Sequence, residues 1–282
     1  MPASPSSSAQ AAREALAARL RELRLDAGLT CLDVAVACGW HKSKSSRLEN
    51  AKTAPSDEDI RAWCHTCDVE DQAADLIAAR RTAESMYVQW RRLEHTGLRR
   101  LQESYVPLYE RTRHFRVYSS RVMPGVLQTE DYARALLSTI AAFRQLADDS
   151  AEAASARVAR SHVIREGRHC FALLMEEDVL YYRYGDTGAM SAQLGYLLAV
   201  MTLPSVSLGI IPRTAPRGMW GQETFTMFDD QRVHVELLTA KVTVTQPSEV
   251  ATYARAFAKL AKMAAYGTDA RALISAAITS LG

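Results

Sequence analysis

Four cysteines near the N-terminus are the first residues whose types could support chemistry. Cys64-His65-Thr66-Cys67 forms a C-x-x-C motif, and Cys31 and Cys38 precede it. Four thiolates could bind zinc or undergo oxidation. There is no second C-x-x-C, however, and Cys64 and Cys67 fall on an apolar helical stripe, where free cysteine commonly acts as a small core residue. We therefore expect neither a metal site nor a cofactor.

The residues that could act in catalysis are few. The chain contains no G-x-S-x-G, H-E-x-x-H, Walker A or dinucleotide-binding fingerprint. Glu176, Glu177 and Asp178 are adjacent, so on a helix they would not face one another, and a charged first helical turn explains them. His234 and Glu236 share one face of a predicted strand and could line a pocket, but a solvated sheet face explains them equally well. We expect no catalytic residues and predict that the protein is not an enzyme.

A basic segment between Trp40 and Lys52 indicates a different chemistry. It contains four Lys or Arg residues and one acid, Glu49, which gives a local net charge of +3 (4 − 1). Such a local excess suits a surface that neutralises phosphates. A solvated charged face is the alternative, and the surrounding elements decide between the two.

Short helices surround this basic segment. Leu16, Leu20 and Leu23 recur helically, and Gly28 suits the residue after a helix C-terminus. Thr30 is a suitable N-cap for a second helix, which Gly39 ends. A third helix is expected over residues 41–50. Ser56 and Asp59 have the spacing of a capping box that opens a fourth helix.

The run GLTCLDVAVACGWHKSKSSRLENAK resembles the helix-turn-helix of xenobiotic-response-element (phage-repressor-like) regulators. The resemblance covers roughly residues 14–69 and implies that the second helix of the motif enters the major groove of DNA. It implies Lys42, Ser43 and Arg47 as base readers, with His41 beside them. The residues implied as DNA backbone contacts are Thr30, Cys31, Lys44, Asn50 and Lys52.

Two positions depart from the pattern of these regulators. Cys31 stands where they usually have Gln, and a thiol is a poor replacement for an amide that meets a phosphate oxygen. Ser45 stands where they prefer an aliphatic residue, and we expect it to weaken packing by about 1 kcal/mol or more.

The resemblance also implies an ion pair within the bundle. Arg24 and Glu49 stand where these regulators commonly have an Arg and a Glu that meet. The planar guanidinium can hold a carboxylate by two hydrogen bonds. An acid facing DNA would repel phosphate, so we expect Glu49 to turn inward and bind Arg24.

The remaining composition sets limits on the whole chain. Of its 282 residues, 48% are hydrophobic and 23% are charged, and the net charge is +2. These values exclude disorder throughout and argue against a polybasic surface along the whole chain. There is no membrane-length apolar run, and residues 1–10 lack the pattern of a secretory signal. An odd number of cysteines, five, favours reduced thiols, so we expect a cytoplasmic protein.

Four segments are expected along the chain: a disordered tail (1–10), the helix-turn-helix domain (11–70), a helical connector (71–104) interrupted near Gly97, and an α+β domain (105–282). In the last segment, helices are predicted over 129–140, 151–164, 190–201, 250–264 and 270–280. Strands are predicted at 170–175 and, by alternation, at 206–210, 225–227, 233–237 and 242–244. The fold class is therefore an all-α bundle followed by a larger α+β domain.

This larger segment resembles the C-terminal domain of unknown function found in regulators of filamentous soil bacteria. The residues that carry the resemblance are Pro124–Thr129, Tyr132–Arg134, Ala156–Arg160, Met190, Gln193–Leu194 and Ile211–Pro212. It implies a transcription regulator that is often encoded beside a small partner protein.

Two hypotheses on function follow. The first is a homodimeric, sequence-specific regulator of double-stranded DNA whose C-terminal domain receives a signal from a small cognate protein. The second is an enzyme or small-molecule sensor in which the helix-turn-helix is a tether. A deep pocket with convergent polar groups would favour the second, and a shallow apolar patch the first. The candidate residues for a ligand or partner site are Gln128, Tyr132, Arg134, His234 and Glu236.

Overall fold

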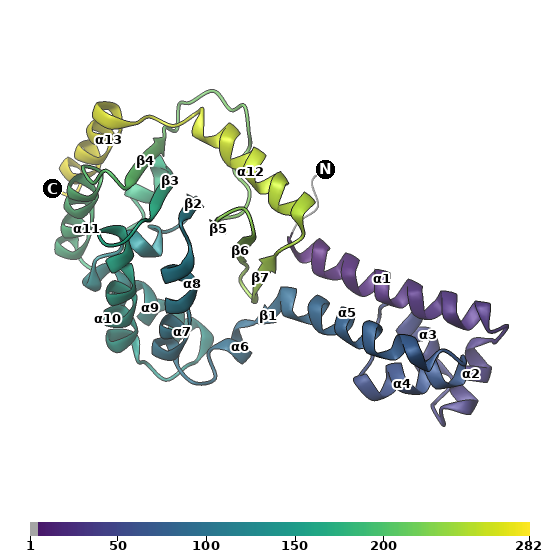
Figure 1. Cartoon of the computed structure of the whole chain (residues 1–282). Coiled ribbons are helices and arrows are strands. Elements are labelled where there is room, and N and C mark those ends of the chain that lie inside the picture. The colour runs from purple at the N-terminus through teal and green to yellow at the C-terminus, as the bar shows by residue number, and fades with distance from the viewer. Residues whose placement is uncertain (1–4) are drawn as a thin grey trace. The chain divides into compact units, whose positions relative to one another are not determined.

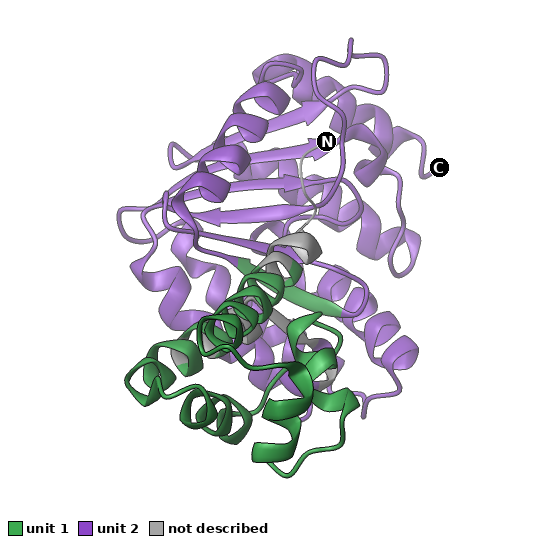
Figure 2. Ribbon diagram, turned by 90° about the vertical axis from the view of Figure 1, so that its right-hand side faces the viewer, with its two compact units in different colours: residues 1–88, 240–243 green, residues 89–239, 244–282 purple. Residues whose placement is uncertain are grey.

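The fold is given by a computed structural model, which describes residues 5–282 except for the side chains of residues 5–9, 11, 78, 81–89 and 91. The chain divides into two compact units (Figure 2). The first unit comprises residues 1–88 and 240–243, and the second comprises residues 89–239 and 244–282. The fold class predicted from the sequence, a helical N-terminal bundle and a larger α+β domain, is confirmed.

The first unit is a bundle of helices (Figure 1). Its helices are α1 (Pro5–Asp26), α2 (Cys31–Ala37), α3 (Ser43–Glu49), α4 (Asp57–Thr66), the 3-10 turn η1 (Glu70–Gln72) and α5 (Ala73–Met86). Leu20, Leu48, Ile60 and Trp63 are almost fully buried at its centre. The two capping boxes are present, from Thr30 to Asp33 at α2 and from Ser56 to Asp59 at α4.

Two glycines end helices where the sequence predicts. Gly28 has a φ of +70° and Gly39 has a φ of +65°, both in the left-handed region that L side chains disfavour. The backbone N–H of Trp40 then donates to the carbonyl of Ala35 over 2.7 Å, which closes the turn between α2 and α3.

The predicted N-terminal tail differs from the structure. α1 begins at Pro5, so residues 5–10 are helical rather than disordered, while residues 1–4 lie outside the described residues. Proline is well tolerated in the first turn of a helix because no intrahelical partner is needed for its missing N–H. The absence of glycine from residues 5–26 then lets the helix continue.

The predicted connector over 71–104 is divided between the two units. α5 packs on α1 and buries Leu76 and Ile77 in the first core. After the short strand β1 (Tyr87–Gln89), α6 (Trp90–Leu93) and α7 (Leu98–Ser104) follow, with Leu98 buried in the second unit. Gly97 separates these two helices with a φ of +96°, as the sequence predicts.

The second unit contains a mixed sheet. Five of its strands run in the order β6-β5-β2-β3-β4, with β2, β3 and β4 parallel and β5 antiparallel to both β2 and β6. The strands are β2 (His114–Ser119), β3 (Cys170–Glu176), β4 (Val206–Ile211), β5 (Phe225–Phe228) and β6 (Arg232–Glu236). A further strand, β7 (Ala240–Val244), lies at the division between the units.

Helices cover this sheet and supply its core. They are α8 (Val106–Arg111), η2 (Gly125–Leu127), α9 (Glu130–Arg144), α10 (Ser150–Arg160), η3 (Ser161–Ile164), η4 (Glu177–Leu180), α11 (Thr187–Val200), α12 (Pro247–Ala261) and α13 (Gly267–Thr279). α11 and α13 pack side by side, and α13 contacts β4 (Figure 1). β3 and β4 are buried along most of their length, which explains their nearly continuous apolar sequences.

Candidate functional site

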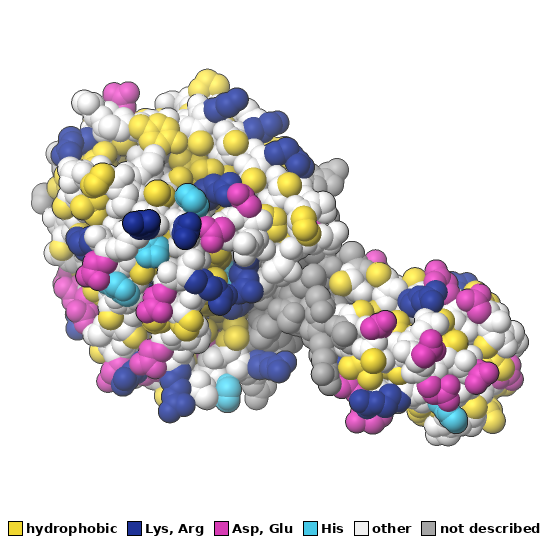
Figure 3. All heavy atoms as spheres, viewed as in Figure 1, with side chains coloured by type: hydrophobic (Ala, Val, Ile, Leu, Met, Phe, Trp, Pro, Cys, Tyr) yellow, Lys and Arg dark blue, Asp and Glu magenta, His cyan; other side chains and the backbone are white. Residues whose placement is uncertain are grey.

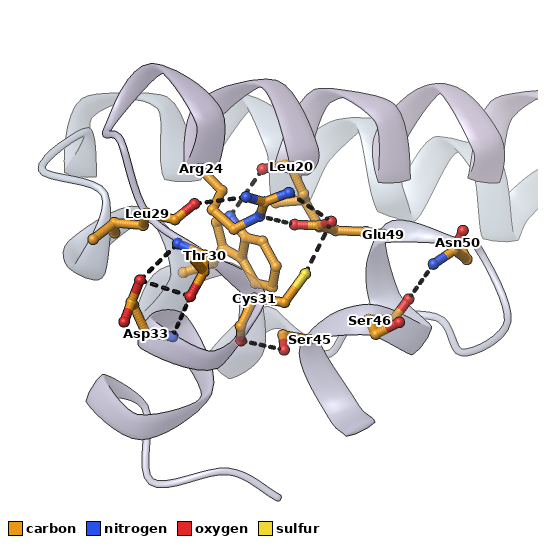
Figure 4. Close-up of polar contacts among 11 residues, drawn as sticks. Leu20, Arg24, Leu29, Thr30, Cys31, Asp33, Ser45, Ser46, Glu49 and Asn50 are labelled. Carbon is orange, nitrogen blue, oxygen red and sulfur yellow. Dashed lines mark hydrogen bonds and ion pairs between the residues drawn. The ribbon is translucent and has the colours of Figure 1, made fainter. Parts of the chain in front are cut away.

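α3 is held in the bundle by a buried ion pair at its C-terminal end (Figure 4). Arg24 Nε lies 2.5 Å from Glu49 Oε1, and Arg24 Nη2 lies 3.1 Å from Glu49 Oε2. Both side chains are more than nine-tenths buried. The third nitrogen, Nη1, donates to the carbonyl of Leu29 over 2.6 Å, and the hydrogen bond to Glu49 raises the pKa of Arg24. The pair predicted from the sequence is present, and it fixes α3 against α1.

Cys31 joins this pair instead of facing outward. Its thiol donates to Glu49 Oε2 at 3.3 Å (Figure 4), and burial together with this hydrogen bond raises its pKa. The Cys31 side chain thus has a partner within the protein, and its contact with the DNA backbone stays a prediction. A protonated thiol can donate to the carboxylate that Arg24 already binds, and so it completes the buried cluster.

The Ser45 side chain has a hydrogen-bond partner within the bundle. The side chain is fully buried, and its hydroxyl donates to the carbonyl of Cys31 over 2.7 Å (Figure 4). A buried hydroxyl is costly only when it lacks a partner. Ser45 therefore links the start of α2 to α3 by a hydrogen bond where an aliphatic residue would do so by packing.

Several residues predicted to contact the DNA backbone have partners within the protein. Lys44 Nζ lies 2.6 Å from Asp59 Oδ1 and 4.4 Å from the centre of the Trp40 ring. The Thr30 hydroxyl donates to Asp33 in the capping box, and the Asn50 amide donates to the carbonyl of Ser46. The resemblance implies that Lys44 contacts a DNA phosphate. In the structure, its ammonium group binds Asp59 and so holds α3 against α4.

Three cations on and beside α3 remain directed to solvent. Lys42, Arg47 and Lys52 are exposed, and none of the ion pairs found within the described residues uses them. Next to Lys42, Nδ1 of His41 lies 2.9 Å from the Ser43 hydroxyl, which orders the first turn of α3. Figure 3 shows acidic and basic side chains intermingled on the visible face of this unit, so charge alone does not identify a binding face there.

The cysteines of the C-x-x-C motif lie in the core. Cys64 and Cys67 are 0% and 5% exposed, and burial raises the pKa of Cys67 to about 11. Within residues that the structure describes, no group of three or more His, Cys, Asp and Glu side chains could hold a metal ion. The positions of Cys64 and Cys67 agree with the apolar stripe on which the sequence places them.

The second unit contains a cavity with a volume of about 230 Å³. Three of the five predicted pocket residues line it: Gln128, His234 and Glu236. The other two do not. Tyr132 is fully buried, and its hydroxyl oxygen accepts from the backbone N–H of Met123, whereas Arg134 is exposed and binds Asp131.

The geometry of α9 explains these two errors. Residues two positions apart on a helix point to different sides, so Tyr132 and Arg134 could not both face one cavity. Arg134 binds Asp131, while Glu130 accepts from the Ser155 hydroxyl.

Sequence reasoning missed the main polar residues of the cavity. Arg157 and Arg160 lie one turn apart on α10, and Gln102 reaches them from α7. Arg144 binds the buried carboxylate of Glu94 and lies over the Trp90 ring with 4.4 Å between the guanidinium carbon and the ring centre. Burial raises the pKa of Glu94. The i, i+3 spacing of two arginines on an otherwise Ala-rich helix was the available signal.

The acidic run at the end of β3 has its own partners. Glu176 binds the guanidinium of Arg217 through two hydrogen bonds of 2.9 and 2.8 Å, and Asp178 lies 2.5 Å from Arg213. Glu177 accepts from the backbone N–H of Arg213. These contacts anchor the loop after β4 to η4, which is a 3-10 turn rather than the α-helical turn that the sequence suggests.

Comparison with known proteins adds two matches. A family described as a domain of unknown function (DUF5753) matches residues 102–276, and a helix-turn-helix domain matches residues 15–77. No curated protein and no solved structure matches the chain. Among the described residues, no helix is both long enough and apolar enough to cross a membrane.

Proposed function

The chain belongs to the DUF5753 family, and from this and its helix-turn-helix domain we propose that the protein is a sequence-specific regulator of transcription. The observation that carries this proposal is the arrangement of α2 and α3. A buried ion pair fixes α3 in place, and its outer surface exposes Lys42 and Arg47. A rigid helix with exposed cations fits the recognition helix of a helix-turn-helix.

Within this proposal, Lys42, Ser43 and Arg47 read bases and Lys52 binds the DNA backbone. Arg47 is the strongest candidate because a guanidinium can donate two hydrogen bonds to a guanine edge. Lys44 contributes by positioning, since it holds α3 to α4 through Asp59. This division of roles separates residues that specify sequence from residues that shape the domain.

The protein acts as a homodimer in this proposal. A single helix-turn-helix contacts few base pairs, so specificity normally comes from two half-sites about one helical turn apart. Sedimentation analysis, with DNA binding to one and two half-sites, tests this. A monomer that binds one half-site as tightly as the whole operator would contradict it.

The source of the signal has two candidates. The family resemblance supports a small cognate partner protein that acts on the C-terminal domain in the cytoplasm. The cavity in the second unit supports the alternative, a small-molecule sensor, because it brings Gln128, His234 and Glu236 together with buried arginines. We propose a regulator rather than an enzyme in either case.

Selection of bound fragments from the genome with the purified full chain tests the regulatory function. We expect recovery of a small set of fragments that share a motif. Their occupancy should change when the proposed partner, a small protein encoded beside this chain, is added. The proposal would be overturned if the recovered fragments share no motif and the chain binds them no more tightly than it binds random DNA.

A further inference from the structure

Two arginines in the second unit, the buried Arg160 and the half-buried Arg157, lack a carboxylate partner. Arg157 and Arg160 project from α10 and line the cavity. Arg160 is 5% exposed. Among the described residues, neither guanidinium has a carboxylate within ion-pair distance. Charged side chains are seldom buried in this way unless they are paired.

The hydrogen bonds of these arginines go to neutral acceptors. Arg157 donates to Gln102 Oε1 over 3.0 Å and to Gln128 Oε1 over 2.6 Å. Arg160 donates to the carbonyl and side-chain oxygens of Gln102 over 3.0 and 3.2 Å. Gln128 is itself fixed, because its Nε2 donates to the carbonyl of Met123. The two amides therefore orient the guanidinium groups without neutralising them.

Donors remain for a ligand. Arg160 Nε is buried with no partner, and neither Nη2 group finds an acceptor within the described part of the chain. The Arg160 guanidinium carbon lies 4.5 and 5.2 Å from the ring centres of Tyr109 and Tyr105. These rings hold the cation by its face and leave its edge for hydrogen bonds.

The electrostatics of the site favour an anion. Burial, and secondly the charge of Arg160, lower the pKa of Arg157 to about 10. Glu236 acts in the opposite direction but makes no ion pair with either arginine among the described residues. The third arginine, Arg144, is neutralised by Glu94. Because Glu236 also lines the cavity, Arg157, Arg160 and Glu236 leave a net charge of +1 (2 − 1), which one carboxylate would balance.

The rest of the cavity wall mixes apolar side chains with polar ones, among them Ser119, Thr224, Thr226, His234 and Glu236. A Cβ placed on Gly125 would lie 3.8 Å from Arg160 Nη2 and 4.0 Å from Arg157 Cδ, so the backbone of η2 closes over both arginines. Apolar side chains cover much of the remaining wall, including Val117, Met123, Leu136, Ile140, Phe225 and Phe228. The 230 Å³ volume far exceeds the ~10–15 Å³ that a cavity needs to hold one water, so it has room for a small organic molecule.

We propose that this cavity binds a small organic acid, with its carboxylate on Arg157 and Arg160 and its apolar body against the surrounding side chains. The carboxylate accepts hydrogen bonds from donors that now lack acceptors, and its charge offsets part of the charge of the two arginines. That this binding is the signal for DNA occupancy rests on the proposed regulatory function, whereas the binding itself does not.

Calorimetric titration of the full chain tests the binding. The probes are hexanoate, which has eight non-hydrogen atoms, 1-hexanol, which has a matching body without the charge, and inorganic phosphate. We expect hexanoate to bind with heat, and 1-hexanol and phosphate to bind at least about tenfold more weakly. Arg157→Gln and Arg160→Gln are each expected to weaken hexanoate binding about 10- to 100-fold and to leave 1-hexanol binding unchanged.

Arg134→Gln is the matched control, because Arg134 is an exposed arginine of the same unit outside the cavity. It should bind hexanoate as the unaltered chain does. Arg157→Lys keeps the charge but loses the planar fork, so it should bind with intermediate affinity and exclude misfolding as the cause of a loss. Circular dichroism of each variant checks the fold.

Four results would overturn the proposal. They are no hexanoate binding at millimolar concentrations, equal affinity for hexanoate and 1-hexanol, equal affinity for hexanoate and phosphate, and unchanged binding in both Gln variants. A fragment selection that yields a motif, combined with any of these results, would leave the regulatory function standing and remove only the ligand. Hexanoate binding without DNA specificity would leave the ligand site standing and remove the regulatory function.

Discussion

Arginines in the two units of this molecule are buried for different reasons. In the first unit, Arg24 binds both oxygens of Glu49 and the carbonyl of Leu29, so its charge and geometry are satisfied within the fold. In the second unit, Arg157 and Arg160 have only neutral acceptors beside an open volume. A buried charge that has a partner within the fold therefore has a structural role, whereas one without such a partner is available to bind a ligand.

The largest effect is expected from removing the partner of Arg24. Glu49→Gln leaves a buried guanidinium without a carboxylate, which should lower the free energy of unfolding of the first unit by roughly 3–5 kcal/mol. Urea denaturation measures this loss, and amide hydrogen exchange in α1 and α3 assigns it to this unit.

Glu22→Gln provides the control, because Glu22 pairs with Arg19 at an exposed position. It should not change the transition measurably. A Glu49→Gln chain that unfolds at the same urea concentration as the unaltered chain would show that the buried pair does not lock the bundle.

Arg47 extends the comparison to an arginine whose partner lies outside the protein. Arg47→Ala should lower the free energy of operator binding by about 1–3 kcal/mol and relax the preference at one base position. Lys52→Ala should weaken binding to all sequences alike. It should also reduce, by about one, the slope of the logarithm of the binding constant against the logarithm of the salt concentration. Binding titrations on operator and random DNA at several salt concentrations measure both. Equal, sequence-independent losses would rule out Arg47 as a base reader.

The Asp59 carboxylate makes the stability of the first unit depend on pH. Burial raises its pKa, but hydrogen bonds from Lys44 and Ser56 outweigh burial, and the net direction is downward. A carboxyl group with a lowered pKa in the folded state stabilises the fold above its unfolded pKa of about 3.9 and loses that contribution as pH falls. Asp59→Asn should therefore reduce the free energy of unfolding by about 1 kcal/mol at pH 7 and flatten its decline between about pH 5 and 3.

Urea denaturation at each pH measures how steeply the free energy of unfolding falls with pH. Lys44→Met, which removes the cation but keeps Asp59, should leave part of the slope through the capping box with Ser56. If the free energy of unfolding of the Asp59→Asn chain falls between about pH 5 and 3 as steeply as that of the unaltered chain, Asp59 is not the group that causes the decline.

The smallest effect on stability is expected at Arg157. Because no carboxylate pairs with it, Arg157→Gln should change the free energy of unfolding of the ligand-free chain by no more than about 1 kcal/mol, in either direction. Urea denaturation with hydrogen exchange in α10 checks this value. A loss as large as that of Glu49→Gln would show that Arg157, like Arg24, is a structural residue.

Local patterns predicted most of the elements. The capping boxes at Thr30 and Ser56 and the stops at Gly28 and Gly39 depend on neighbours in the chain, so the sequence contains them. The strands β4 to β7 alternate clearly. The strand β2, at the centre of the sheet, was missed although His114 to Ser119 also alternates, because it follows a helix without a turn signal.

Helical spacing and strand alternation within short segments specify the α+β class, so the sequence contains it. The helix-turn-helix and the Arg24–Glu49 pair were implied by the resemblance of the sequence to known regulators. Which polar residues share the cavity depends on the packing of distant segments. Gln102, Gln128, Arg157 and Glu236 are far apart in the chain, and they meet because α7, η2, α10 and β6 pack around one volume. The tertiary structure also decided that Cys31 and Lys44 turn inward, because a thiol and an ammonium group bind whichever buried carboxylate packing brings to them.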